Sequence, residues 1–215
     1  MVIHAFPPIE LADKSGLLAV GGDLDLESLL LAYRQGIFPW PVDARHLLWF
    51  APPQRAVLFL NDFHIPRSLV RERKKNKYTF RLNSDFEFII SACAASDNRR
   101  AQSGTWITPQ MKEAYIRLFH QGYAFCAACY ENELPVGGLY GVVIGHMIAG
   151  ESMFYRRSNA SKLALLFLVE HLKSDGIPWI DCQVMTPLLK SFGAVLVGRS
   201  RFTKMLQKQV QQPQY

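Results

Sequence analysis

From residue 55 onward, the sequence alternates between short apolar runs typical of strands and amphipathic runs typical of helices. Strand patterns lie at 56–60, 78–83, 123–154 and 177–184, and the longest of these contains a hairpin and three strands. Helix patterns lie at 65–76, 85–96, 105–122, 158–176 and 200–209. Because strands that alternate with helices form helix-covered sheets, this region predicts an α/β (α+β) domain with a mixed sheet flanked by helices.

The segment 1–54 differs in composition and is rich in proline and in turn signals. Within it, GGDLDLESLLLAYRQG predicts a helix, since Asp25 is a good N-cap, Glu27 favours the first turn and Gly36 ends the pattern. The turn IFPWP follows and must either display or bury Trp40. We therefore predict a small N-terminal domain at 1–54 and a larger domain at 55–215.

Composition bounds the class of protein. The chain has 215 residues, of which 49% are hydrophobic, which suffices for one sizeable core. No apolar run approaches the roughly 20 residues of a membrane span, and the N-terminus lacks signal-peptide features. We expect a soluble, cytoplasmic protein. Cys126 and Cys129 form a C-x-x-C pair, but on a strand they face opposite ways, so we expect small buried residues rather than a metal or redox site.

The strand pattern IPWIDCQV carries two polar residues in an apolar run. With a period of two, Asp181 and Gln183 share one face, roughly 6.5–7 Å apart. A strand that follows a buried helix is covered on both faces, and a buried carboxylate must be paired, hydrogen-bonded or poised with a shifted pKa. The alternatives are a solvated face, or a pair that satisfies a neighbouring loop.

A second carboxylate stands in AGESMFYRR, where Glu151 ends a predicted strand just before the helix pattern at 158–176. A strand–helix–strand crossover makes the next strand parallel and usually adjacent. Glu151 therefore approaches the face that holds Asp181 and Gln183. Two carboxylates and an amide are suited to orienting an amine and managing its proton. The alternative is an ordinary charge at a strand end.

Three tryptophans, Trp40, Trp49 and Trp106, lie in or beside turns. Such rings suit stacking on nucleotide bases, although filling a core edge is the commoner fate of a Trp. The net charge is +6, and the run PRSLVRERKKNK concentrates six cations. This run is either a solvated helix face or a contact for a phosphate backbone.

Several classes of site find no support. GGD and VGGLYG are not a P-loop, and no G-x-G-x-x-G or G-x-S-x-G motif occurs in the required context. The six histidines are dispersed, without ligand spacing. We therefore expect neither a metal nor a cofactor.

Seven stretches together resemble the bacterial leucyl/phenylalanyl-tRNA–protein transferases, and they run in order along the chain. They are GLLAVGGDL (16–24), LLLAYRQGIFPW (29–40), LLWFAPPQRAVL (47–58), SGTWIT (103–108), ELPVGGLYGVVIG (133–145), GESMFYRRSNASKLAL (150–165) and IDCQV (180–184). The chain departs from relatives that read WWSP where it has WFAP (49–52).

The resemblance implies an aminoacyltransferase that needs no cofactor. Such enzymes move leucine or phenylalanine, and methionine less well, from aminoacyl-tRNA to proteins with N-terminal Arg or Lys. The product is marked for degradation by the N-end rule pathway. The resemblance also implies a small N-terminal domain and a larger domain like the GNAT acetyltransferases. We expect a monomer that binds no membrane.

The resemblance also assigns residue roles. It implies that Gln183 draws the proton from the attacking amine, that Asp181 orients it, and that Glu151 completes the catalytic network. Trp40 and Trp106 resemble the pair that stacks on the terminal adenosine. The amino-acid side-chain pocket corresponds to Leu139, Ile148, Leu168 and Ile180. The contact with the tRNA backbone corresponds to Arg67, Arg71, Arg73, Lys74, Lys75 and Lys77.

Two other functions are compatible with parts of the sequence. A GNAT-type acyl-CoA transferase would share the fold, but YRRSNASKL lacks the glycine-rich phosphate turn such enzymes place before a helix. A non-catalytic tRNA-binding adaptor would use the basic run and the tryptophans alone. The adaptor has no need for Glu151, Asp181 and Gln183 together. The sequence does not fix the preference between leucine and phenylalanine, because a modest size difference is weakly discriminated in an apolar pocket.

Overall fold

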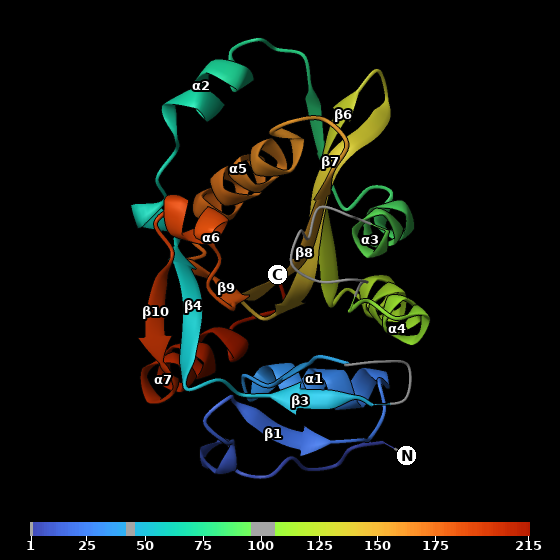
Figure 1. Ribbon diagram of the computed structural model, residues 1–215, viewed down its shortest axis with the longest axis vertical. Helices are drawn as coiled ribbons and strands as arrows, with labels where there is room; N and C mark the ends of the chain where they lie inside the picture. Colours follow the sequence, from blue (N-terminus) through green and yellow to red (C-terminus); the bar gives the residue numbers. More distant parts are fainter. Residues whose placement is uncertain (1, 42–45, 96–105) are drawn as a thin grey trace.

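The computed structural model describes residues 2–41, 46–95 and 106–215 of the chain. Seven strands form one mixed sheet in the order β10 (Val195–Gly198), β4 (Gln54–Phe59), β9 (Trp179–Gln183), β8 (Met147–Tyr155), β7 (Leu134–Ile144), β6 (Ala124–Glu131) and β5 (Thr79–Leu82) (Figure 1). Within it, β8 and β9 are parallel, and the other neighbouring pairs are antiparallel. The predicted mixed sheet is confirmed.

A second, three-stranded sheet lies in the N-terminal part of the chain, in the order β1 (Leu17–Val20), β3 (Leu48–Phe50) and β2 (Phe38–Pro39). Trp49 of β3 is fully buried, and its Nε1 donates a hydrogen bond to the Gly21 carbonyl at 2.8 Å. This tryptophan is therefore a core residue and not a stacking surface. The division of the chain into domains at residue 54 stays a prediction.

Seven α-helices lie in the described ranges. They are α1 (Leu26–Arg34), α2 (Arg67–Arg73), α3 (Phe86–Ala94), α4 (Pro109–His120), α5 (Ala160–Ser174), α6 (Pro187–Ser191) and α7 (Arg199–Val210). Two short 3-10 helices, Ile9–Leu11 and Leu60–Asp62, complete the elements. The segment 97–104, between the helix patterns at 85–96 and 105–122, lies outside the described residues.

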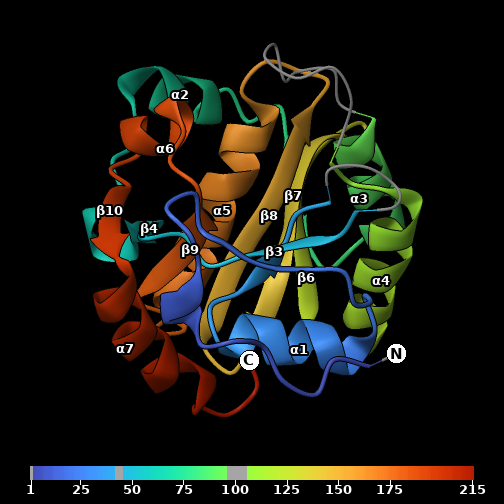
Figure 2. The same ribbon diagram turned by 60° about the horizontal axis from the view of Figure 1, so that its bottom comes forward.

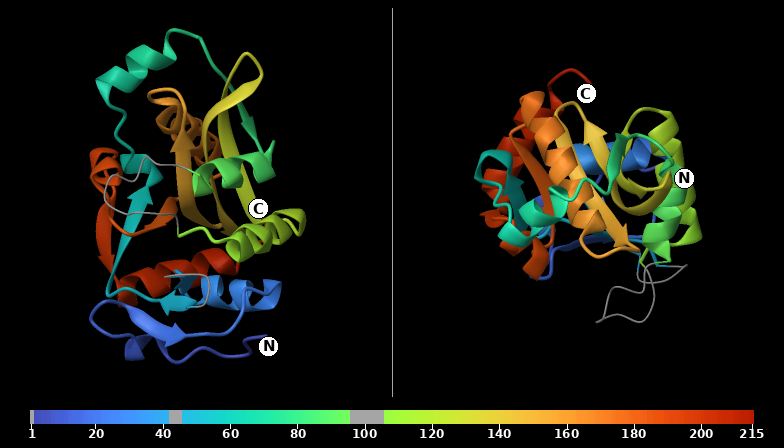
Figure 3. Two further views of the ribbon diagram at one scale, coloured as in Figure 1. Left: turned by 45° about the vertical axis from the view of Figure 1, so that its right-hand side comes forward. Right: turned by 90° about the horizontal axis from the view of Figure 1, so that it is seen from above.

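The helices cover both faces of the seven-stranded sheet. Figure 2 shows α3 and α4 on one side of β6, β7 and β8, and α5 on the other. Figure 3 shows α7 running across one end of the sheet, close to α1. Cys126 belongs to the core under α3 and α4, whereas Cys129 belongs to the core under α5. The prediction that these two sulfurs face opposite ways is therefore confirmed.

Helix starts follow the sequence in part. Thr108 caps α4, because its hydroxyl oxygen accepts a hydrogen bond from the Met111 amide at 3.2 Å. Asp25 is the residue before α1, but its side chain makes no cap bond. The residue before α5 is Asn159, with a left-handed φ of 67° and no side-chain cap bond, so backbone geometry rather than a side chain starts this helix.

Candidate active site

The parallel pair β8 and β9 brings the predicted polar residues together. Ile148 pairs with Ile180 and Ala149 with Asp181, with α5 forming the connection between the strands. At the ends of these strands, Gln183 Nε2 donates a hydrogen bond to Glu151 Oε1 at 2.7 Å. The expected approach of Glu151 to the face of Gln183 is confirmed, because a right-handed crossover places consecutive parallel strands side by side.

Both residues lie at irregularities of the sheet. Tyr140 pairs with Ser152 and Gly141 with Gly150, so Glu151 is the extra residue of a bulge in β8. A second register shift separates Asp181 from Gln183 on β9. Gln183 has a φ of 60°, a left-handed conformation that is strained for a residue other than glycine. Bulges re-aim side chains, and here they turn the amide and the carboxyl toward each other.

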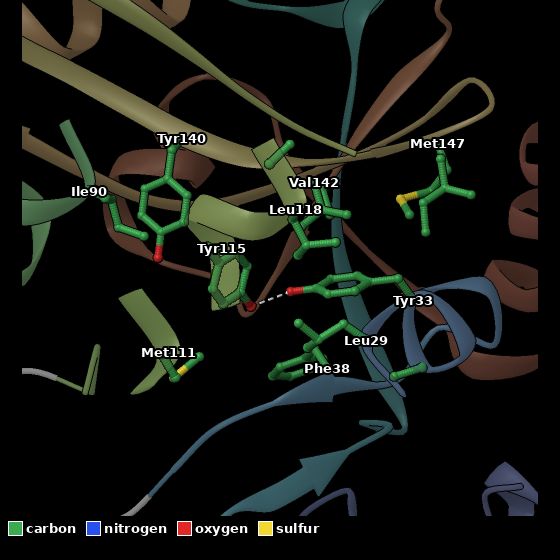
Figure 4. Packing of buried hydrophobic residues seen from close by; sticks show 14 of the residues in the cluster. Leu29, Tyr33, Phe38, Ile90, Met111, Tyr115, Leu118, Tyr140, Val142 and Met147 are labelled. Carbon is green, nitrogen blue, oxygen red and sulfur yellow. Dashed lines mark hydrogen bonds between the residues drawn. The ribbon is translucent and has the colours of Figure 1, made fainter. Parts of the chain in front are cut away.

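Two buried tyrosines complete the surroundings of Glu151. The Tyr33 hydroxyl donates to Glu151 Oε1 at 2.7 Å, and the Tyr115 hydroxyl donates to Oε2 at 3.3 Å. The two hydroxyl oxygens lie 2.6 Å apart and point toward one another between α1 and α4 (Figure 4). The Glu151 carboxyl therefore has hydrogen-bond donors at both oxygens.

The environment of Glu151 raises its pKa to about 7. Burial is the largest cause, because it disfavours the charged form, and the negative charge of Asp181 acts in the same direction. The hydrogen bonds from Tyr33 and Gln183 and the positive charge of Arg55 lower the pKa and offset part of this effect. A carboxyl group with a pKa near 7 exchanges a proton readily at neutral pH, as a general acid–base group must.

Asp181 forms a buried ion pair with Arg55. Arg55 Nε donates to Oδ1 at 2.8 Å and Nη2 donates to Oδ2 at 2.6 Å, and both side chains are 2% exposed. Asp181 Oδ1 also accepts a hydrogen bond from the Gln183 backbone amide at 2.9 Å. Arg55 was not among the residues that the sequence singled out.

A cavity of about 560 Å³ opens beside the Glu151–Gln183 pair, and most of its wall is apolar. Of the nine residues predicted for catalysis, base stacking and the side-chain pocket, seven line it: Trp40, Trp106, Leu139, Glu151, Leu168, Ile180 and Gln183. Two others do not. Ile148 pairs with Ile180 in the sheet and is 1% exposed, and Asp181 faces Arg55. Ile148 is not among the residues that line the cavity, and its role in the side-chain pocket stays a prediction.

The two predicted stacking residues meet at the wall of the cavity. The rings of Trp40 and Trp106 are stacked, with centroids 5.5 Å apart and an angle of 25° between their planes. Trp40 follows β2 and Trp106 precedes α4, so the pair joins the N-terminal part of the chain to the larger sheet and its helices. This arrangement presents an aromatic surface beside the Glu151–Gln183 pair.

The basic run forms α2 and the turn after it, and all six of its predicted contact residues are exposed. Arg73 forms an ion pair with Glu170, and Lys75 pairs with Glu72. Within the described part of the chain, the other four cations form no ion pair: Arg67, Arg71, Lys74 and Lys77. The helix therefore offers free positive charge to solvent.

Across the described residues, no group of three or more His, Cys, Asp or Glu side chains is placed to hold a metal ion. The same residues contain no helix that is both long enough and apolar enough to span a membrane.

Replacing Glu151 by Gln should change how stability depends on pH. The folded pKa of about 7 lies above the ordinary glutamate value of 4.5, so between these two values the folded state holds a proton that the unfolded state has lost. Stability therefore falls as pH rises from about 4.5 to 7, by at most about 3 kcal/mol. Glu151→Gln removes this loss. The free energy of unfolding of the variant, measured in urea, should therefore increase relative to that of the wild type between pH 5 and pH 8. Parallel curves for the two proteins would contradict the raised pKa.

The fold and the site together are those of an α/β enzyme with a largely apolar cavity at the ends of its central parallel strands, lined by a hydrogen-bonded carboxyl–amide pair. The sequence profile of the leucyl/phenylalanyl-tRNA protein transferase family matches residues 57–207, and the profile of that family's N-terminal domain matches residues 22–53. The chain belongs to this family.

Individual proteins named leucyl/phenylalanyl-tRNA–protein transferase agree with this assignment. The protein from Dechloromonas aromatica (strain RCB) is 46% identical over 206 residues, which are 95% of this chain and 88% of that protein. The protein from Pseudomonas fluorescens (strain Pf0-1) is 43% identical over 212 residues, 98% of this chain and 93% of that protein. Among solved structures, L-PGS from Bacillus licheniformis covers 86% of this chain and 70% of its own at 13% identity, with a TM-score of 0.44.

Proposed function

We propose that this protein transfers a leucyl or phenylalanyl group, and less well a methionyl group, from aminoacyl-tRNA to the N-terminal amine of proteins that begin with Arg or Lys. The reaction takes place in the cytoplasm, requires no cofactor, and marks the acceptor for degradation by the N-end rule pathway. The observation that carries the proposal is the hydrogen-bonded Glu151–Gln183 pair at the wall of a largely apolar cavity. Such a reaction needs an apolar space for the transferred aliphatic or aromatic side chain and a proton acceptor close to the attacking amine.

The chemistry begins with attack of the acceptor's α-amine on the ester carbonyl of the aminoacyl-tRNA. The C–N bond forms, the bond from the carbonyl carbon to the ribose oxygen breaks, and the amine loses one proton while that oxygen gains one. Gln183 uses its Nε2 to donate to Glu151, which leaves its Oε1 to accept a hydrogen bond from the amine. A neutral amide orients the amine but is a poor base, so Gln183 acts first as an orienting acceptor.

Glu151 is the group that we assign to receive the proton. It lines the cavity, it lies against Gln183, and its pKa of about 7 suits acceptance from the amine and return to the ribose oxygen. The aminoacyl ester is already activated, so holding amine and ester in attack geometry supplies much of the rate. Such positioning is worth roughly 7–11 kcal/mol in well-oriented systems.

The rest of the cavity accommodates the aminoacyl-adenosine end of the tRNA. Leu139, Leu168 and Ile180 form an aliphatic wall for the transferred side chain. We assign the Trp40–Trp106 stack to the terminal adenine, because each base–aromatic contact is worth about 1–3 kcal/mol. The remaining tRNA then reaches the free cations of α2.

Reversing charge on α2 should weaken tRNA binding in a salt-dependent way. Each phosphate contact contributes about 0.7–0.9 to the slope of log affinity against log salt concentration. The double variant Arg71→Glu/Lys74→Glu should therefore reduce that slope by about 1.4–1.8, as measured by filter binding between 50 and 200 mM salt (roughly the range over which such contacts are screened). Lys14→Glu, an exposed cation outside α2, is the control. Equal slopes for both variants would remove α2 from the interface.

The function is tested with purified protein, tRNA charged with radiolabelled leucine, and peptides that begin with Arg or Ala. No ATP or metal is added, and label in the peptide is followed over time. We expect transfer to the Arg peptide and none to the Ala peptide. Absence of transfer by a folded protein that still binds the charged tRNA would overturn the enzymatic function and favour a tRNA-binding adaptor.

A further inference from the structure

The Arg55–Asp181 ion pair lies behind the site rather than in it. Both side chains are 2% exposed, and neither is among the residues that line the cavity. The two Asp181 oxygens together accept three hydrogen bonds, two from Arg55 and one from the Gln183 backbone amide. The carboxylate is thus fully engaged inside the protein, and a substrate amine in the cavity has no access to it.

Arg55 is itself held rigidly from three sides. Its Nη1 donates to the Gly36 carbonyl at 3.0 Å, just after α1. Its guanidinium group lies 4.6 Å from the ring centroid of Phe38 in β2 and 4.8 Å from that of Phe202 in α7. A planar guanidinium that stacks on rings and binds a carboxylate through two nitrogens fixes the orientation of that carboxylate. Through Arg55, the position of Asp181 is therefore fixed relative to the N-terminal part of the chain and to α7.

Asp181 in turn fixes the backbone of Gln183, because it accepts a hydrogen bond from the Gln183 amide. Gln183 stands at φ 60°, and this strained turn includes a hydrogen bond of 2.7 Å from the Val184 amide to the Cys182 carbonyl. A strained backbone persists only where its surroundings fix it. The hydrogen bond from the Gln183 amide to Asp181 Oδ1 provides that constraint, and the resulting turn aims the Gln183 side chain at Glu151.

We propose that Arg55 is a positioning residue for the transfer reaction, and that Asp181 acts only as its partner by fixing the backbone turn at Gln183. In this arrangement Glu151 receives the amine proton, and Asp181 never contacts the substrate. The inference rests on the proposed function, because the geometry it explains is that of the group facing the transferred amine.

The test replaces both members of the pair at once, in the double variant Arg55→Met/Asp181→Leu. Well-packed apolar residues often substitute for a buried ion pair without loss of stability, so this variant is expected to fold. Its kcat for leucyl transfer should fall about 100-fold, as expected for a misplacement of about 1 Å. Its KM for charged tRNA should stay within about threefold of the wild-type value, since the Trp40–Trp106 stack and the aliphatic wall of the cavity are unchanged. Arg199→Met is the matched control: Arg199 binds the Ala51 carbonyl but does not touch Asp181, and it should retain wild-type kcat.

The pH profile separates positioning from proton transfer. The double variant should keep a rate midpoint set by Glu151, at or above pH 7. One charge that raises the pKa of Glu151 and one that lowers it are removed together, and loss of the hydrogen bond from Gln183 raises this pKa further. A double variant with wild-type kcat would overturn the inference, and so would loss of this midpoint, which would make Asp181 the proton acceptor.

A crystal structure of the double variant gives a readout that does not depend on activity. We expect the Gln183 backbone to leave the left-handed region and its Nε2 to lose hydrogen-bond contact with Glu151. An unchanged Gln183 would overturn the inference even if the wild type transferred nothing. Absence of transfer by the wild type would, in contrast, overturn the proposed function alone.

Discussion

Replacing Glu151 by Gln should lower the rate of leucyl transfer about 10²–10⁴-fold, the usual contribution of a positioned general base. Gln keeps the size of the side chain and retains an oxygen to accept the hydrogen bonds from Tyr33 and Gln183. It does not accept a proton at neutral pH, so the loss falls on the chemical step. Single-turnover transfer from charged tRNA to an Arg peptide measures this step directly, with Glu133→Gln as an exposed control for the same chemical change.

The pH dependence of the same reaction identifies the group. In the wild type, the rate should rise with pH through about 7, because Glu151 accepts a proton only when ionised. A second rise comes from the acceptor's α-amine, whose pKa is about 7.7–8.0 and which attacks only when neutral. In Glu151→Gln only the second rise should remain. A variant that retains both rises, or that transfers at the wild-type rate, would show that another group or the tRNA takes the proton.

Long, periodic patterns in the sequence predicted the larger part of the fold. The helix pattern at 158–176 and the strand pattern at 177–184 form α5 and β9, and each element buries most of its side chains. The elements that sequence reasoning missed are short. Strand β10 has four residues, three of them exposed, and α6 has five residues, none buried. Such segments carry no hydrophobic period, and tertiary contacts decide their structure.

The site residues also fall into those that the sequence predicts and those that it does not. The proximity of Glu151 and Gln183 was predictable because strands joined by a helix are usually parallel and adjacent, a general rule that needs only the order of the elements. Arg55, Tyr33 and Tyr115 were not found, since each looks ordinary in its local pattern. A tyrosine in the apolar stripe of a helix is expected to be an ordinary core residue. An arginine near the start of a strand is expected to be exposed to solvent. Their polar atoms gain a role only from partners distant in the sequence, such as Asp181, 126 positions from Arg55.

The second large effect is expected from Arg55→Met alone. This change leaves the Asp181 carboxylate 2% exposed and without its cation. Removing one partner of a buried pair typically costs about 3–5 kcal/mol, because the desolvation of the other charge is no longer compensated. For a chain of this size, each kcal/mol shifts Tm by about 2–4 °C, so Tm should fall by about 6–20 °C. Urea unfolding and calorimetry at pH 8 measure both quantities.

Two further variants locate the origin of that loss. Arg73→Met breaks an exposed pair with Glu170 and should cost less than about 1 kcal/mol. Adding Asp181→Leu to Arg55→Met removes the unpaired charge and should restore most of the stability, although the turn at Gln183 still lacks its anchor. If Arg55→Met were as mild as Arg73→Met, water or a rearranged neighbour would be solvating Asp181, and the pair would not be the rigid support of the site. A double variant that is stable but slow would instead separate the two roles of this pair, because stability would then depend on charge compensation and transfer on the geometry that Arg55 imposes.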